Sequence, residues 1–294
     1  MEIVITGSLG NISKALTQQL VQDGHSVTVI SSKAERIPGI ETLGAKAAIG
    51  TVKDATFLTD IFYGKDAVYL MSPADFTESD QHAYYKYIAQ VYKEAIEKSG
   101  IKRVINLSSY GAELPSGTGF ISASHNIEQI LDTVPDIFLT HIRPTYFYYN
   151  LFAFIKTIKT KGYIGAVYGG EDKLAMVSPK DIASAIAEEI TNTTNFRKVR
   201  YVTSDDRTCN EIAQVLGNAI GISSLKWMPI SPDVVKQSLL EDGIPEIVAD
   251  NYVELAEATH SGILREDYER NLPVFGKVKI EDFAIEFAEA YHRE

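Results

Sequence analysis

The sequence has only one cysteine, Cys209, so the chain cannot form an intramolecular disulfide. We therefore expect a reducing compartment, and we interpret Cys209 as a small, partly buried residue rather than a nucleophile. The sequence also lacks a signal peptide and an apolar run of membrane-spanning length, because the apolar run at its start is short. These absences predict a soluble, cytoplasmic protein with no membrane partner.

Basic charge is also scarce. The 294 residues include 28 basic and 39 acidic side chains, a formal charge of −11, which disfavours a surface that binds nucleic acid or anionic lipid. A local basic pocket for one phosphate is still compatible with this balance. The histidines are scattered without the spacing of metal ligands, so we expect no metal site. They are His25, His82, His125, His141, His260 and His292.

The first sixteen residues carry the clearest pattern. A short apolar run over 2–6 predicts a buried strand, and a period of four in the apolar residues after it predicts a helix. Gly7 and Gly10 lie between them, where a sharp turn and a close backbone approach let a helix N-terminus bind a pyrophosphate. Ser13 replaces the third glycine of the usual motif and is small enough to fit. The residues predicted to bind the cofactor here are Thr6, Gly7, Leu9, Gly10, Asn11 and Ile12.

An ordinary tight turn is the alternative interpretation of these glycines. Dinucleotide binding is favoured because a second strand, 26–30, follows after a helix of suitable length and completes a βαβ unit. Ser31, Ser32 and Lys33 follow that strand, with Arg36 close behind, and no acidic residue stands at the strand end to bind the ribose hydroxyls of NAD. Two hydroxyls and a lysine suit a 2′-phosphate, so NADP(H) is favoured over NAD(H), although a solvated loop gives the same pattern.

Strands and helices continue to alternate, which predicts a doubly wound parallel sheet. Strands are expected at 46–49, 66–71, 102–107 and 138–142, and helices at 55–62, 122–133 and up to Ser99 from a cap at Thr77 or Ser79. Loops at the carboxyl ends of such strands line the ligand crevice. Four more residues are therefore predicted to bind the cofactor, with Ser108 a fifth: Met71, Ser72, Pro73 and Pro144.

The alternation weakens after residue 150. We predict a dinucleotide-binding domain over 1–150 and a smaller, mostly helical substrate lobe over 151–294, with part of 151–205 returning to the first sheet. Ser178 and Asp181 are spaced as a capping box, with Pro179 at the first helical position. Further helices are expected at 209–220, on both sides of 243–245 and at the end of the chain, and strands at 199–203 and 225–230.

Aromatic residues are dense over 145–150, directly after a predicted strand. They can form the wall of a pocket for a flat organic molecule, or they can pack beneath the loop, and the sequence does not decide between the two. The residues predicted to line an acceptor pocket are Ser109, Tyr110, Phe120, Tyr146, Phe147 and Asn150.

The order of these motifs resembles the NmrA-like members of the atypical short-chain dehydrogenase/reductases. The matching residues are Thr6 to Gly10, Ser108, Ser109, His125, Glu128, Arg143, Pro144, Tyr146, Phe147, Asn150, Val177 and Asp181 to Ala183. The resemblance covers nearly the whole chain and implies a Rossmann-like fold that binds NAD(P). It leaves the activity open, because the family includes NADPH-dependent quinone and dye reductases, plant reductases of aromatic compounds and non-catalytic dinucleotide sensors.

One departure from the wider family is informative. Short-chain dehydrogenases use a Tyr-x-x-x-Lys pair for proton transfer, whereas the two possible alignments here give Phe120 with Ser124 or Ile121 with His125. Ordinary alcohol oxidation and nucleotide-sugar epimerisation are thereby disfavoured. His125 shares a helix face with Glu128 and is either a catalytic residue or part of a structural pair. Ser108 and Tyr110 are the other catalytic candidates.

The hypothesis that results is an NAD(P)H-dependent oxidoreductase that reduces a small aromatic or quinone-like acceptor, a reaction that needs no Tyr/Lys pair. The alternative is a non-catalytic NADP(H) sensor that reports to a protein partner. The sequence allows a monomer or a homodimer.

Overall fold

The computed structural model describes residues 1–75, 78 and 80–293. The chain divides into two compact units that alternate along the sequence. The first comprises Met1–Ala112, Ala123–Arg143 and Ile182–Arg200, and the second comprises Glu113–Ser122, Pro144–Asp181 and Tyr201–Glu294. In the described part of the chain, no helix is both long and apolar enough to cross a membrane.

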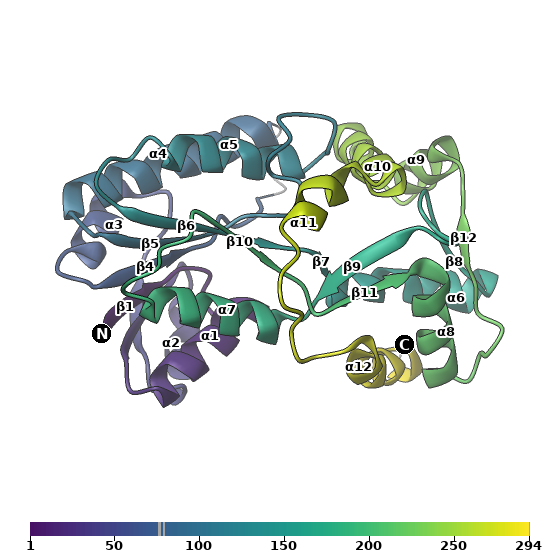
Figure 1. Cartoon of the computed structure of the whole chain (residues 1–294), viewed down its shortest axis with the longest axis horizontal. Helices are drawn as coiled ribbons and strands as arrows, with labels where there is room; N and C mark the ends of the chain where they lie inside the picture. Colours follow the sequence, from purple (N-terminus) through teal and green to yellow (C-terminus); the bar gives the residue numbers. More distant parts are fainter. Residues whose placement is uncertain (76–77, 79, 294) are drawn as a thin grey trace. The chain divides into compact units, whose positions relative to one another are not determined.

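A sheet in the order β10-β6-β5-β4-β1-β2-β3 forms the centre of the first unit, and its pairs from β1 to β6 are parallel. The strands are β1 (Glu2–Ile5), β2 (Ser26–Ser31), β3 (Lys46–Ile49), β4 (Ala67–Leu70), β5 (Arg103–Leu107), β6 (Phe138–Pro144) and β10 (Val199–Val202). The helices are α1 (Asn11–Gln22), η1 (Ala34–Arg36), α2 (Ile37–Thr42), α3 (Ala55–Phe62), α4 (Gln81–Ser99), α5 (Ile121–Leu131) and α7 (Pro179–Thr191). Figure 1 shows α3, α4 and α5 on one face of this sheet and α1, α2 and α7 on the other.

The predicted doubly wound fold is confirmed. Because helices cover both faces, β4 in the middle of the sheet is buried along its whole length, as its continuous apolar sequence requires. The chain first runs outward from β1 through β2 to β3, and β4 then begins on the other side of β1. The carboxyl ends of β1, β2, β4 and β5 therefore lie along one edge, on both sides of a topological switch point.

The start of α4 differs from the prediction. Thr77 and Ser79 lie outside the described residues, and the cap that the structure describes is Asp80, whose carboxylate accepts a hydrogen bond from the Ala83 N–H at 2.9 Å. The helix ends at Gly100, as predicted, in the left-handed conformation with φ of 71°.

Short strands and several helices build the second unit. Its sheets have the orders β11-β9-β7 and β12-β8, and the latter pair is parallel. The strands are β7 (Tyr146–Phe147), β8 (Ile164–Ala166), β9 (Lys173–Val177), β11 (Asp205–Thr208) and β12 (Trp227–Pro229). The helices are η2 (Tyr148–Phe154), α6 (Ile155–Lys161), α8 (Cys209–Ala219), α9 (Pro232–Glu241), α10 (Glu246–Ser261), η3 (Ile263–Arg265), α11 (Glu266–Arg270) and α12 (Ile280–Arg293).

Aromatic side chains fill much of the core of this unit. The rings of Tyr148 and Phe283 stack with centroids 5.4 Å apart, and Trp227 packs edge-on against Phe154. Cys209 is fully buried here, at the start of α8. Burial raises the pKa of its thiol well above the usual range, which agrees with a packing role.

The predicted capping box at the start of α7 is wrong in its partners. Pro179 does occupy the first helical position, but the N–H of Ser178 donates to the hydroxyl of Ser204 at 2.9 Å. The Asp181 carboxylate accepts instead from Ser204 at 2.6 Å and from the N–H of Val278 at 3.1 Å. The Ser178 hydroxyl still caps the helix locally, because it accepts from the N–H of Lys180 at 3.2 Å. Donors from distant segments replace only the bond that the spacing predicts for the Asp181 carboxylate.

Candidate functional site

The turn after β1 has the backbone geometry that its glycines predict. Gly7 has φ of +88° and Ser8 has φ of +53°, both in the left-handed region. A Cβ on Gly7 would lie 2.5 Å from the Ser13 hydroxyl and 2.8 Å from the end of the Met71 side chain. The Ser13 hydroxyl donates to the Thr6 carbonyl at 2.9 Å, so the residue in place of the third glycine fits and joins the turn to α1.

The N-terminus of α1 is open to a ligand. Gly10 is its N-cap, and in the described part of the chain no side chain caps it and no acidic residue lies in its first turn. The first N–H groups of the helix, from Asn11 and Ile12, have no partner within the helix, and the helix dipole makes this end favourable for an anion. Gly10 is exposed, and a Cβ there would lie 3.1 Å from the Gly7 carbonyl oxygen. Leu9 packs against Gly39 at the side of the turn.

At the end of β2, one serine is structural and its neighbours are exposed. The Ser31 side chain is buried, and its hydroxyl accepts from the Ser8 hydroxyl at 2.9 Å and from the N–H of Lys33 at 3.2 Å. The side chains of Ser32, Lys33 and Arg36 are exposed. Ser31 therefore shapes the loop, and the other three present one hydroxyl and two positive charges to the solvent.

Hydrogen bonds hold the loop after β4 in place. The Thr6 hydroxyl accepts from the N–H of Met71 at 2.6 Å, and the hydroxyl of Tyr92 donates to the Met71 carbonyl at 2.7 Å. Burial raises the pKa of Tyr92, so this phenol stays protonated and able to donate. The hydroxyl of Tyr84 donates to the Pro73 carbonyl at 3.0 Å. The Ser72 Oγ between them is buried and has no hydrogen-bond partner among the described residues, so it is available to a ligand.

A buried ion pair lies behind the end of β5. Arg143 of β6 donates to Glu128 of α5 through two nitrogens, Nε to Oε1 at 3.0 Å and Nη2 to Oε2 at 2.7 Å. The hydroxyl of Ser108, directly after β5, donates to the same Oε1 at 2.5 Å. All three residues are less than a tenth exposed. The pairing is a bidentate, charge-assisted one, which fixes the orientation of the serine.

The other candidates near β5 have separate partners. The Ser109 hydroxyl donates to the Tyr110 carbonyl at 3.0 Å, and Tyr110 is buried. His125 Nδ1 lies 2.9 Å from the Ala112 carbonyl, which can only accept, so Nδ1 is the donor of this hydrogen bond. Of the two roles left open for the helix-face pair, Glu128 takes the structural one with Arg143, and the catalytic role of His125 stays a prediction.

The remaining predicted residues belong to the second unit. Tyr146 and Phe147 form β7, are half-buried and pair in parallel with β9. The Tyr168 hydroxyl lies 3.4 Å from that of Tyr146, and burial raises the pKa of Tyr168. Phe120 is half-buried, Pro144 is buried and Asn150 is exposed.

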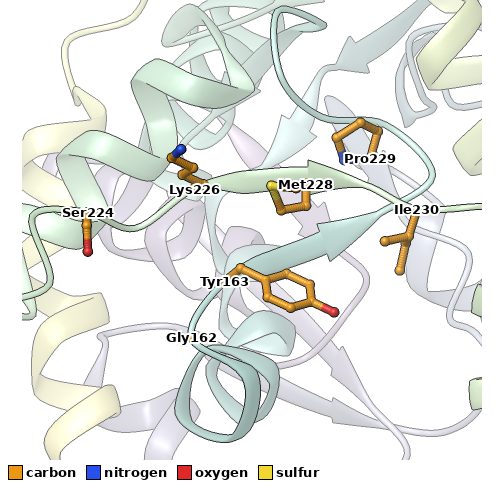
Figure 2. Close-up of a pocket in the computed structure, with 7 residues that line it drawn as sticks. All are labelled: Gly162, Tyr163, Ser224, Lys226, Met228, Pro229 and Ile230. Atoms are coloured by element: carbon orange, nitrogen blue, oxygen red, sulfur yellow. The ribbon is translucent and has the colours of Figure 1, made fainter.

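A hollow of about 360 Å³ lies beside β8 and β12 in the second unit, with Tyr163, Lys226 and Met228 around it (Figure 2). It contains none of the residues predicted for the acceptor. Its lining is largely exposed side chains, and it does not coincide with the aromatic run over 145–150.

Two parts of the site were not predicted. The two tyrosines of α4 that bind the loop after β4, Tyr84 and Tyr92, were not predicted to do so. The sequence suggested His125 as the partner of Glu128, and it gave Arg143 no partner. The available signal that Glu128 and Arg143 pair was a charged residue at the end of a buried strand.

Several known proteins have a related sequence or a related fold. A family profile described as NAD(P)H-binding matches residues 7–193. A (4-alkanoyl-5-oxo-2,5-dihydrofuran-3-yl)methyl phosphate reductase from Streptomyces griseus is 25% identical over 264 residues, which are 88% of each chain. The crystal structure of an NADPH-dependent quinone oxidoreductase from Escherichia coli in complex with NADPH has a TM-score of 0.77 at 19% identity and covers 99% of both chains. That of a nucleoside-diphosphate-sugar epimerase from Staphylococcus aureus has a TM-score of 0.78 at 15% identity over 97% of this chain and 100% of that one, which shows a shared fold and not a shared reaction.

The family and the fold that the resemblance implies are confirmed. The family profile spans the turn after β1, the strand ends at the switch point and more than half of the chain. The chain therefore belongs to the NAD(P)H-binding family.

Proposed function

We propose that the protein is an NADPH-dependent reductase of a small aromatic or quinone-like acceptor. The observation that carries this proposal is the open, glycine-capped N-terminus of α1 at the switch point of a parallel sheet, next to a loop that presents Lys33 and Arg36. In folds of this type, the pyrophosphate of a dinucleotide binds at such a helix end.

The residues along the edge have separate tasks in this proposal. The N–H groups at the start of α1 bind the pyrophosphate, and Gly10 keeps the space in front of them open. Ser32, Lys33 and Arg36 bind the 2′-phosphate by charge-assisted hydrogen bonds. Met71, Ser72 and Pro73, which Thr6 and two tyrosines hold in place, border the middle of the cofactor. Ser108 lies two strands from β1, roughly 10 Å at the usual strand spacing, which suits the nicotinamide end.

The bound cofactor supplies a hydride for the reaction. A quinone that accepts the hydride becomes a hydroquinone anion and then takes its proton from water, and a carbocationic dye needs no proton. Neither acceptor requires the missing Tyr/Lys pair, so orientation of the two flat rings is the main task of the protein. The half-buried rings of Tyr146 and Phe147 suit contact with a flat acceptor. The name of the Streptomyces relative describes a reductase of an unsaturated ring, which is compatible with an electron-poor acceptor.

Turnover with a panel of acceptors tests the proposal. Purified protein should oxidise NADPH in the presence of a quinone or a triarylmethane dye and be nearly inert with simple ketones. The difference should be about 10²- to 10⁴-fold, the usual contribution of a positioned proton donor. Saturable NADPH binding without turnover of any acceptor would favour the non-catalytic sensor. Rapid ketone reduction would contradict the argument from the missing pair.

A further inference from the structure

The two strands β8 and β12 form a ribbon with one covered face and one exposed face. Ile164 and Ala166 of β8 and Trp227 of β12 are buried in the aromatic core of the second unit. Because successive side chains of a strand point to opposite faces, Gly165 and Met228 lie on the other face, where the register pairs them with each other. This other face carries the hollow of about 360 Å³ (Figure 2).

A glycine lets two lining residues lie close against this face. A Cβ on Gly165 would lie 2.9 Å from the ring of Tyr163 and 3.3 Å from Cδ1 of Ile230. The absence of a side chain at Gly165 therefore makes room for the tyrosine ring, which gives the hollow an aromatic wall. The volume is near the lower end of the usual range for small-molecule pockets, so the hollow suits one small molecule and not a segment of a partner protein.

Polar groups without a partner surround this apolar surface. In the described part of the chain, no side-chain hydrogen bond or ion pair involves Lys226, Tyr163 or Ser224, all of which line the hollow. Lys226 offers an ammonium group and the other two offer hydroxyls, and all three groups can donate. Other lysines of this acidic chain pair with carboxylates, as Lys53 and Lys236 do. An unpaired ammonium group beside two hydroxyls favours an anionic group on the ligand.

We infer that the hollow is a second binding site, which takes a small, flat aromatic molecule with one anionic group. The aromatic part lies against the Tyr163 ring and Met228, because aromatic rings stack and a methionine sulfur makes favourable contacts with them. The anionic group accepts from Lys226. All the lining residues belong to the second unit, whereas the turn after β1 belongs to the first, so the inference does not depend on the proposed function.

The only tryptophan of the chain gives a local readout for this site. Trp227 stands in the sequence between two lining residues, Lys226 and Met228, so its fluorescence reports what binds in the hollow. The probe is 8-anilinonaphthalene-1-sulfonate, a flat aromatic anion that accepts excitation energy from tryptophan. Titrated into the whole protein, the probe should bind saturably and quench the emission of Trp227. Saturating NADP⁺ should leave this binding unchanged, because the dinucleotide occupies other residues.

Lys226→Met tests the role of the charge, because it nearly keeps the length of the side chain. It should weaken binding of the probe about 2- to 5-fold, as expected of an exposed ion pair. Lys277→Met is the matched control and should bind the probe like the wild type. Lys277 is exposed, does not line the hollow and has no side-chain partner within the ranges that the structure describes.

Two further measurements separate the charge from the aromatic wall. N-phenyl-1-naphthylamine has the same rings as the probe and no charge, so the wild type and Lys226→Met should bind it equally. Tyr163→Ala removes the aromatic wall and should weaken both molecules about 3- to 10-fold. Thermal unfolding should confirm that each variant is folded.

Three results would overturn the inference. The first is equal affinity of the sulfonate probe for the wild type and Lys226→Met. The second is displacement of the probe by NADP⁺, which would show that it binds along the edge of the first sheet. The third is an affinity that falls as the protein concentration rises, because a second copy of the chain would then cover the hollow. None of them bears on the proposed function, which turnover with the acceptor panel tests separately.

Discussion

Two parts of one sheet edge are built in opposite ways. Around β1, the groups that we propose to bind the cofactor are backbone N–H groups with no partner inside α1, beside a glycine without a side chain. Around β5 and β6, the side chains of Ser108, Glu128 and Arg143 pair with one another in the interior. The first part is suited to bind and the second to orient. In the first part the binding groups are backbone atoms, so the critical feature is the absence of a side chain at Gly10. In the second part the loss of either partner leaves a charge buried without its counterion.

The largest effect on stability should come from breaking the buried pair. Arg143→Met leaves the Glu128 carboxylate buried without its guanidinium, so the free energy of unfolding should fall by about 3 to 5 kcal/mol. The double variant with Glu128→Leu should regain much of this loss, because it removes both charges. Urea unfolding measures both.

An exposed pair in the same unit provides the control for that experiment. Lys98 and Glu94 on α4 lie 2.6 Å apart with side chains 61% and 50% exposed. Lys98→Met should cost less than about 1 kcal/mol. An equally small cost for Arg143→Met would show that the two parts of the edge do not differ as described.

The charge beside the β1 turn should matter for binding and not for folding. Lys33→Glu should weaken NADPH binding about 10- to 100-fold and NADH binding much less, because the new repulsion acts at the 2′-phosphate. Titrations with both cofactors measure this. Lys102→Glu makes the same charge change before the amino end of β5 and should affect neither cofactor. Equal losses for NADPH and NADH in Lys33→Glu would contradict the assignment of Lys33.

The smallest expected effect is a change of stability with pH, and it depends on Asp132, the residue after α5. Burial raises the pKa of the Asp132 carboxyl, but hydrogen bonds from His141 and Lys198 outweigh it and hold the pKa below its usual value. A lowered pKa in the folded state stabilises the protein above the unfolded pKa, and this stabilisation is lost as pH falls through the folded pKa. Asp132→Asn should therefore cost about 1 kcal/mol at neutral pH and almost nothing in strong acid.

Urea unfolding of the wild type and of Asp132→Asn, from neutral pH to strong acid, measures the difference in their free energies of unfolding. A cost that does not change with pH would show that Asp132 acts through packing and not through its charge.

The two units also differ in how much of them the sequence predicts. In the first, the boundaries of α3 and β3 and the turn at Gly7 follow from local patterns, because short apolar runs mark the strands, helices with an apolar face lie between them, and glycine marks the turn. In the second, β8, β9 and β11 were not predicted. They have three to five residues and owe their pairing to distant segments, as Ile164 does with Trp227.

The candidate site follows the same division. The glycine turn is a local motif and was predicted with its residues. The partners of Glu128 and Asp181 were not, because they lie 15 to 97 positions away and depend on how the chain folds back. A capping-box spacing at Ser178 thus gave the right helix start and the wrong partner for the carboxylate.

Calorimetric titration of Gly10→Val with NADPH tests the central claim most directly, that the backbone at the start of α1 binds the cofactor. Gly10 has φ of −65°, which valine can adopt, so the variant should stay folded, and its thermal unfolding should confirm this. The branched side chain would occupy the space of the pyrophosphate, so binding should fall at least about 100-fold. NADPH affinity equal to that of the wild type in the folded variant would show that the dinucleotide binds elsewhere.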